Sequence, residues 1–132
     1  MTGRVLGACT AHNSAKFIVH DYIGTVVTQA FFTAPFACLI TDIVARPRVA
    51  GSDGSAVSLS FYNVPSGVAV ASGALLHSGS YNMKGTADTN QVLTLVTDPD
   101  VLRLDAGDSI GFVVTGTATA AIGVITIALE PI

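Results

Sequence analysis

Hydrophobic and polar residues alternate over short runs along most of the chain, and turn-forming residues separate these runs. The clearest alternation lies in residues 56–63, where three large apolar side chains face three hydroxyl-bearing ones across the strand, namely Val57, Leu59 and Phe61 against Ser58, Ser60 and Tyr62. Because successive side chains of a β-strand point to opposite faces, this period of two predicts a strand with one solvated face. The same reasoning predicts seven or eight strands, at residues 16–22, 24–32, 36–46, 56–63, 91–97, 101–104, 109–115 and 121–130.

The last of these strands, residues 121–130, is apolar on both faces. One face carries Ile125, Ile127 and Leu129, and the other carries Ile122, Val124 and Ala128. A strand whose two sides are both apolar is typical of burial on both sides. We therefore expect protein to cover both faces of this strand.

Turn-forming residues set the expected boundaries of the strands. Pro47 is expected to stop ladder pairing after the third strand, because proline has no amide hydrogen to donate. The polar sequence Asp105-Ala106-Gly107-Asp108 is expected to turn the chain between two apolar runs, as are the glycine, serine and aspartate of residues 49–55. Residues 68–84 have weak periodicity, which leaves open a short helix at residues 69–77 or a strand followed by a loop.

Many short strands with turns at this spacing predict an all-β fold, an antiparallel β-sandwich. A helical fold is not expected, because Val, Ile, Thr and Gly dominate the runs and no helical period continues beyond two turns. A length of 132 residues is typical of one domain. We expect an extended amino-terminal arm at residues 1–14, where no period is sustained, and a single β-sandwich domain at residues 15–132.

The composition adds that the chain has few charges with which to face water. Charged residues make up 11% of the chain and hydrophobic residues 50%, whereas charged residues make up about a quarter of a typical soluble domain. Open apolar faces and strand edges risk aggregation, and symmetric self-assembly is the commonest way to close them. We therefore expect contacts with other protein, made by the arm and the last strand: Arg4, Val5, Leu6, Ile122, Val124, Ile125, Ile127 and Leu129.

Charge and hydropathy argue against nucleic acid and membrane as partners. The net charge is −3 and the nearest approach to a basic cluster is the pair Arg46 and Arg48, so direct binding to nucleic acid is not expected. Residues 22–41 carry no formal charge, but Gly24, Gln29 and Pro35 interrupt the stretch and favour a β-hairpin over a membrane span. The first seven residues lack the apolar core of a signal peptide, so export by that route is not expected.

No arrangement of residues indicates catalysis or a bound cofactor, and we do not expect an enzyme. His12, His20 and His77 stand far apart in the sequence and outside any metal-binding motif. No serine or threonine lies in the Gly-x-Ser-x-Gly motif that surrounds the nucleophile of many hydrolases. Cys9 and Cys38 are the only cysteines, and their spacing leaves open two free thiols or one disulfide bond.

Four aspartates within eleven residues could offer oxygen ligands to calcium: Asp98, Asp100, Asp105 and Asp108. Their spacing does not match an EF-hand calcium loop. Aspartate beside proline or glycine is also what turns require, because the carboxylate accepts hydrogen bonds from nearby backbone N–H groups. We therefore expect these residues to form turns and to bind no metal.

Several segments of residues 36–132 share a further pattern with a known class of proteins. They are residues 40–48 (ITDIVARPR), the strand at residues 55–63, the small residues that follow it, residues 91–95 (QVLTL) and residues 101–112 (VLRLDAGDSIGF). Together these segments resemble the small capsid decoration, or cement, proteins of tailed bacteriophages. The resemblance does not extend to residues 1–35.

The resemblance implies a jelly-roll-like sandwich that is made in the host cytoplasm and forms a homotrimer on the outer surface of the capsid. There it would stabilise contacts between subunits of the major capsid protein, without catalysis, and residues 1–14 would reach along the capsid lattice. The alternative is a receptor- or carbohydrate-recognising domain of a fibre or head appendage. With three Tyr, six Phe and no Trp, the chain has few aromatic rings on which a sugar could stack.

Overall fold

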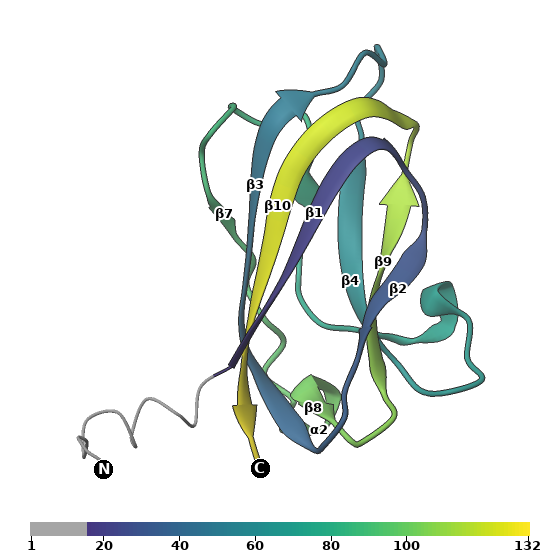
Figure 1. Ribbon diagram of the computed structural model, residues 1–132, viewed down its shortest axis with the longest axis vertical. Helices are drawn as coiled ribbons and strands as arrows, with labels where there is room; N and C mark the ends of the chain where they lie inside the picture. Colours follow the sequence, from purple (N-terminus) through teal and green to yellow (C-terminus); the bar gives the residue numbers. More distant parts are fainter. Residues whose placement is uncertain (1–15) are drawn as a thin grey trace.

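The computed structural model describes residues 16–132, which form two antiparallel β-sheets packed face to face (Figure 1). Sheet A has the strand order β1 (Lys16–Val26), β10 (Ala118–Pro131), β3 (Cys38–Ala50) and β7 (Gln91–Val92), with β8 (Arg103–Leu104) also paired to β3. Sheet B has the order β2 (Gln29–Thr33), β9 (Ser109–Thr115), β4 (Ser58–Val64) and β5 (Ala74–Leu75), with β6 (Tyr81–Asn82) also paired to β4. The predicted all-β, antiparallel sandwich is confirmed.

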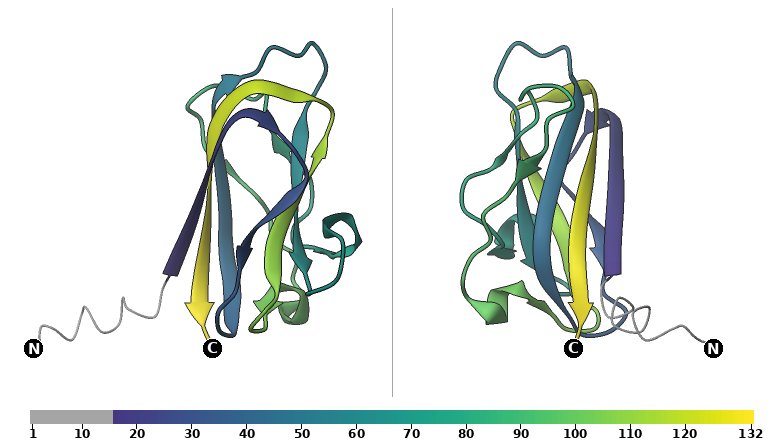
Figure 2. Two further views of the ribbon diagram at one scale, coloured as in Figure 1. Left: turned by 45° about the vertical axis from the view of Figure 1, so that its right-hand side comes forward. Right: turned by 90° about the vertical axis from the view of Figure 1, so that its left-hand side faces the viewer.

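Three long strands make up most of sheet A. β1 pairs with β10 from Lys16 opposite Leu129 to Val26 opposite Ala118. β10 pairs on its other side with β3, and the right-hand view of Figure 2 shows the three strands side by side. Valine, isoleucine and threonine are frequent in these strands, and their branched side chains suit a pleated sheet.

The chain crosses between the two sheets at short connections, which the left-hand view of Figure 2 shows. Only Val27 and Thr28 separate β1 in sheet A from β2 in sheet B, and the Thr28 hydroxyl accepts a 3.0 Å hydrogen bond from the N–H of Val114 in β9. The connection from β3 to β4 is held by Asp53, whose carboxylate accepts a 2.8 Å hydrogen bond from the N–H of Thr119 in β10. These bonds tie each connection to a strand beside it, the first to β9 of sheet B and the second to β10 of sheet A.

The hydrophobic core lies between the inner faces of the two sheets. Phe61 and Phe112 of sheet B are fully buried, with ring centroids 6.2 Å apart and an edge-to-face angle of 77°. Ile43, Ile125 and Ile127 of sheet A are fully buried opposite them. Burial of each such side chain contributes about 1.5–3 kcal/mol to folding.

A buried tyrosine pair joins the two sheets within the core. The ring of Tyr22 in β1 lies across Gly123 of β10, where a Cβ atom would overlap with Oη and Cζ of that ring. Its hydroxyl shares a 2.6 Å hydrogen bond with the hydroxyl of Tyr81 in β6. Burial raises the pKa of both tyrosines, so both stay protonated and one hydroxyl donates to the other.

His77 is the second polar group that the core accommodates. Its Nε2 accepts a 2.9 Å hydrogen bond from the N–H of Phe61, and its Nδ1 lies 3.0 Å from the carbonyl oxygen of Ser78. A carbonyl oxygen can only accept, so Nδ1 carries the hydrogen and the ring is neutral. Burial lowers the pKa of His77, which favours this neutral form.

Two predicted boundaries in the first half of the chain are wrong. The first strand does not end at Tyr22, because β1 continues through a register shift near Gly24 to Val26. Pro47 does not end the third strand, because β3 continues to Ala50. Pro47 lies opposite Gly123 beside a second register shift, and such an irregularity tolerates a residue that cannot donate to the ladder.

Two predicted strands in the second half are also shorter than expected. Residues 91–97 contain only the two-residue strand β7 and an isolated bridge between Leu95 and His77. In residues 101–104 the strand is limited to β8, because Pro99–Leu102 forms the helical turn α2. Asp98 caps this turn and proline occupies its first position, which are both favourable helix-start signals.

Residues 68–84, for which the sequence left open a short helix or a strand followed by a loop, form neither over most of their length. It contains the 3-10 turn η1 (Val70–Ser72) and the short strands β5 and β6, joined by loops. None of the helices within residues 16–132 has the length and hydrophobicity needed to span a lipid bilayer.

Candidate interaction surface

The outward side of sheet A carries neighbouring apolar side chains from several strands, and we call it the outer face. Its side chains lie in four rows across β1, β10 and β3, as the strand register shows. In order along β1 these rows are Phe17, Ala128 and Asp42; Val19, Thr126 and Val44; Asp21, Val124 and Arg46; and Ile23, Ile122 and Val49. Val92 of β7 extends the second row beside Val44.

Large hydrophobic side chains on the outer face are strongly exposed. Ile23 is 74% exposed, Phe17 68%, Val92 66%, Val19 62% and Val49 42%. These are five of the ten exposed large hydrophobic side chains within residues 16–132. Scattered apolar residues are normal on a protein surface, but a contiguous patch rimmed by polar groups is typical of an interaction site.

The central row of the outer face carries one acid and one base. Asp21 and Arg46 flank Val124 from the two neighbouring strands. Within residues 16–132 the one ion pair is Arg103 with Asp105, so neither Asp21 nor Arg46 has a charged partner there. Both line a hollow of about 660 Å³ on this face, which Arg48 and Asp88 also line.

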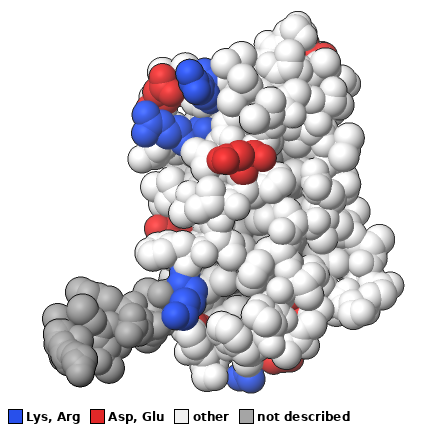
Figure 3. Space-filling model, viewed as in Figure 1, with Lys and Arg blue, Asp and Glu red and all other residues white. Residues whose placement is uncertain are grey.

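Charged groups on this side of the molecule are few. Figure 3, drawn in the view of Figure 1, shows a surface that is mostly uncharged, with several acidic and basic groups on its left side, one acidic group nearer the middle and others at the edges. The low charge content of the sequence therefore leaves a broad uncharged area exposed in the folded protein.

The structure divides the residues that the sequence singled out on the last strand. Ile122 and Val124 lie half-buried on the outer face. The other three, Ile125, Ile127 and Leu129, point inward and are 0%, 0% and 3% exposed, because they pack in the core against sheet B. Sheet B thus provides the cover for one face of β10, and only the outer face is left for another protein.

The predicted arm residues Arg4, Val5 and Leu6 lie outside the described residues. Sequence reasoning did not single out Phe17, Val19 and Ile23, which are the most exposed apolar residues of β1. They alternate with Ile18, His20 and Tyr22, which are also apolar or aromatic, so hydropathy alone could not show which side faces out.

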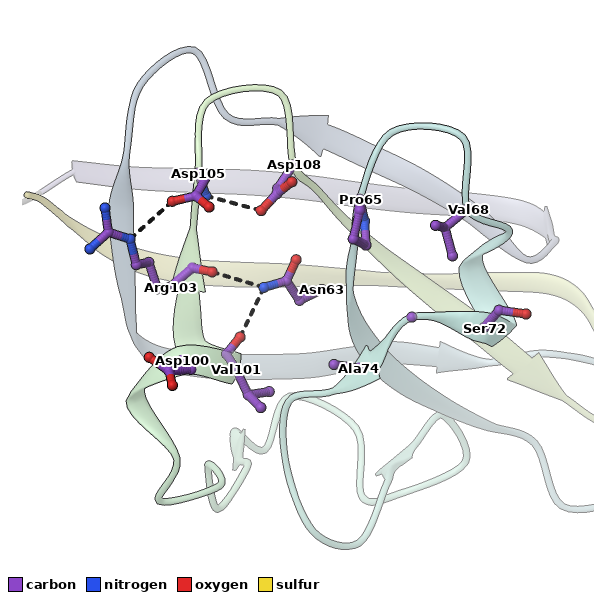
Figure 4. Close-up of a pocket in the computed structure, with 11 residues that line it drawn as sticks. Asn63, Pro65, Val68, Ser72, Ala74, Asp100, Val101, Arg103, Asp105 and Asp108 are labelled. Atoms are coloured by element: carbon purple, nitrogen blue, oxygen red, sulfur yellow. Dashed lines mark hydrogen bonds and ion pairs between the residues drawn. The ribbon is translucent and has the colours of Figure 1, made fainter.

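A second hollow, of about 590 Å³, lies at the end of the molecule that carries α2 and β8 (Figure 4). Asn63 of β4 lines it and is only 7% exposed. Its side-chain Nδ2 donates 2.9 Å hydrogen bonds to the carbonyl oxygens of Val101 and Arg103, while its Oδ1 is buried without a hydrogen-bond partner. Asn63 thereby holds α2 and β8 against sheet B.

The aspartates around this hollow form turns, as predicted. Asp98 accepts a 3.0 Å hydrogen bond from the N–H of Asp100, and Asp108 accepts one of 3.0 Å from the N–H of Asp105. Asp105 also forms a 3.0 Å ion pair with Arg103, in which the Arg103 Nε donates. Within residues 16–132 no three His, Cys, Asp or Glu side chains, these aspartates included, lie close enough together to hold a metal ion.

The histidines and cysteines are not gathered in one place. His20 packs against the rings of Phe31 and Phe112, with centroids 5.0 and 5.7 Å away, and burial lowers its pKa while the nearby Asp21 opposes this shift. His77 lies in the core, and the Cys38 thiol is buried, which raises its pKa. His12 and Cys9 lie outside the described residues.

Comparison with known proteins finds likeness in structure alone. No protein-family model matches the sequence, and no curated protein matches it. The structure is similar to a chain in "Capsid of Ralstonia phage GP4", with a TM-score of 0.63 and 8% identity over 89% of this chain and 84% of that one. It is also similar to a chain in "Cyanophage Pam1 capsid asymmetric unit", with a TM-score of 0.51 and 13% identity over 87% of this chain and 80% of that one.

Proposed function

We propose that this protein is a structural component of a bacteriophage head, a decoration protein that binds the outer surface of the capsid and stabilises contacts between major capsid subunits. The observation that carries this proposal is the likeness of its fold to chains of two phage capsid structures, over 89% and 87% of this chain. The sequence resemblance to capsid decoration proteins agrees with it.

The surface of the described residues supports a function in assembly. A charge-poor sandwich with five strongly exposed apolar side chains on or beside one sheet is poorly suited to remain alone in water. Such a patch is suited to bury itself against protein, and burial contributes roughly 25 cal/mol for each Å² of apolar area removed from water.

The proposed mechanism is binding, in which no covalent bond forms or breaks. Each bound copy adds contacts that must be broken before neighbouring capsid subunits can separate. Because many copies act on one lattice, individually weak contacts add through their high effective concentration. We infer that the copies form homotrimers at threefold or quasi-threefold positions, with residues 15–132 as one sandwich domain.

The arm at residues 1–14 completes the proposal. Arg4, Val5 and Leu6 would contact the capsid surface, since β1 begins at Lys16 and the arm precedes it directly. On the terminal strand, Ile122 and Val124 are the proposed contact residues whose side chains lie on the outer face.

Cryo-electron microscopy of the particles whose genome encodes this chain tests the proposal. We expect density for three copies of the sandwich at each threefold or quasi-threefold position on the outside of the shell. Density confined to tail fibres or other appendages would instead favour recognition of a receptor or carbohydrate. Particles from which the protein is absent would show that it is no part of the virion.

A further inference from the structure

We propose that copies of this chain bind one another through the outer face of sheet A, with the β1 side of one copy against the β3 side of the next. In this arrangement Asp21 of one copy forms an ion pair with Arg46 of its neighbour. The inference rests on the proposed function and deepens it, because it names the surface that joins the copies.

The strand register places the two charges on opposite flanks of one row. Asp21 lies opposite Val124, and Val124 lies opposite Arg46. Neighbouring strands are about 4.8 Å apart, so the two backbones that carry the charges are roughly 10 Å apart. Neither side chain has an ionic partner within residues 16–132, so both charges can pair with another molecule.

The neighbouring rows have apolar residues on both flanks. Ile23 and Val49 flank Ile122 in one row, and Val19 and Val44 flank Thr126 in the other. When the β1 flank of one copy meets the β3 flank of another in register, Asp21 faces Arg46 and apolar residues face apolar residues. Across these three rows the contact therefore has one pair of opposite charges between apolar rows, while in the outermost row Phe17 of one copy faces Asp42 of the next.

This internal match is the reason to choose a second copy as the occupant of the face. A rotation about an axis parallel to β10 brings the acidic flank of one copy to the basic flank of the next. A rotation about an axis across the strands would instead place Asp21 against Asp21, which repels. A foreign partner would require no agreement between the two flanks of this one face.

The hollow on the face gives the charges a recessed place to meet. Its volume is about 660 Å³, and it is lined by the apolar Ile23, Ile122 and Val124 and by four charged residues, namely Asp21, Arg46, Arg48 and Asp88. Arg48 and Asp88 have opposite charges, so Arg46 leaves the β3 side of the hollow with a net positive charge toward Asp21 of a neighbour. An ion pair that is partly enclosed by protein is screened less by salt than one on an open surface. Juxtaposing like charges in such a contact weakens association at least about tenfold.

Charge reversal in the full-length chain tests the pairing. We compare Asp21→Arg, Arg46→Asp and the double variant by analytical ultracentrifugation over a range of concentrations and salt. Each single variant should weaken self-association at least about tenfold, and the double variant should recover it. Asp100→Arg, which makes the same change of net charge on exposed α2, is the control and should associate like the original chain.

Mixing the two single variants distinguishes the symmetry of the assembly. In a twofold dimer of one variant with the other, both contacts pair opposite charges, so mixing should restore dimers. In a closed ring of three, every mixed ring keeps at least one contact of like charges, so mixing should leave trimers weak. Recovery in the double variant but not in the mixture therefore supports a trimer joined through this face.

Single variants that associate as strongly as the original chain, or a double variant that does not recover, would overturn the inference. A chain that stays monomeric at all concentrations would do the same. None of these results affects the proposed attachment to the capsid, which depends on where the protein lies on the particle, although a chain that stays monomeric would also contradict the homotrimer. Conversely, recovery of self-association in a protein that is absent from the capsid would retain the inference and refute the function.

Discussion

Replacement of Gly123 by alanine is the substitution whose effect the structure defines most directly. Gly123 lies on the inner side of β10, and the ring of Tyr22 covers it so closely that an added Cβ would overlap with Oη and Cζ of that ring and lie 2.6 Å from Cε2. The glycine is needed for this close approach, since its backbone has no positive φ. The ring must therefore move if the variant folds.

The expected cost has two parts. Moving the ring breaks the 2.6 Å hydrogen bond between Tyr22 and Tyr81, which are 3% and 0% exposed, and a buried hydroxyl left without a partner costs about 1–3 kcal/mol. Overpacking in a filled core costs about 1–3 kcal/mol more. We expect Gly123→Ala to lower the free energy of unfolding by about 2–6 kcal/mol, which corresponds to roughly 10–20 °C in Tm.

Urea denaturation followed by far-ultraviolet circular dichroism measures this change, because the chain has no tryptophan to report by fluorescence. Gly54→Ala is a matched control, since no atom lies within 4 Å of the Cβ position there and its φ is not positive. We expect the control to change the free energy of unfolding by less than about 0.5 kcal/mol.

A double-mutant cycle separates the overlap from any effect of alanine on β10 itself. In a Tyr22→Leu background the ring is gone, so adding Gly123→Ala should cost less than about 1 kcal/mol. If Gly123→Ala costs as little as Gly54→Ala, or costs the same with and without the Tyr22 ring, then the close contact of ring and glycine does not determine stability and our reasoning is wrong.

Three further predictions concern the buried polar groups and the arm. Asn63→Asp should destabilise the fold by about 3 kcal/mol or more at pH 7, because it turns a carboxylate toward two carbonyl oxygens. Asn82→Asp, at the exposed residue of β6, should have little effect in the same urea titration. Because burial lowers the pKa of His77 below its usual 6.5, the unfolded chain binds the proton more readily, so stability should be fully present above about pH 7 and fall as the pH drops below 6.5. Burial lowers the pKa of His20 as well, so the slope is measured in a His20→Gln variant, and a flat profile there would contradict the assignment. Deletion of residues 1–14 should leave the urea midpoint unchanged and weaken attachment to particles produced without the protein. Loss of folding on deletion would contradict the assignment of these residues to an arm outside the sandwich domain.

The sequence predicted the fold class because strand signals act over a few residues. The alternation in residues 56–63 became β4, with Leu59 and Phe61 fully buried and the hydroxyl side chains facing out. Turn chemistry was equally local, since Asp108 accepts a hydrogen bond from the N–H of Asp105 within the turn that the sequence indicated.

Features that depend on distant parts of the chain could not be predicted in this way. Pro47 stays within β3 because a register shift opposite Gly123 of β10 accommodates it. Asn63 is buried because the carbonyl oxygens of Val101 and Arg103, about forty residues along the chain, accept its hydrogen bonds. His77 likewise reaches the core through the N–H of Phe61. No pattern within a short window of sequence contains these partners.

The residues on the two faces of β10 show why the sequence predicted the outer face only in part. β4 and β10 cover the same core from opposite sheets, and the inward residues of both are apolar. Their outward residues differ, because β4 presents Ser58, Ser60 and Tyr62 while β10 presents mainly apolar groups such as Ile122 and Val124. A strand that needs to cover only its own core has no use for apolar residues on the other side. This contrast within one molecule is what we expect if water covers sheet B and protein covers sheet A.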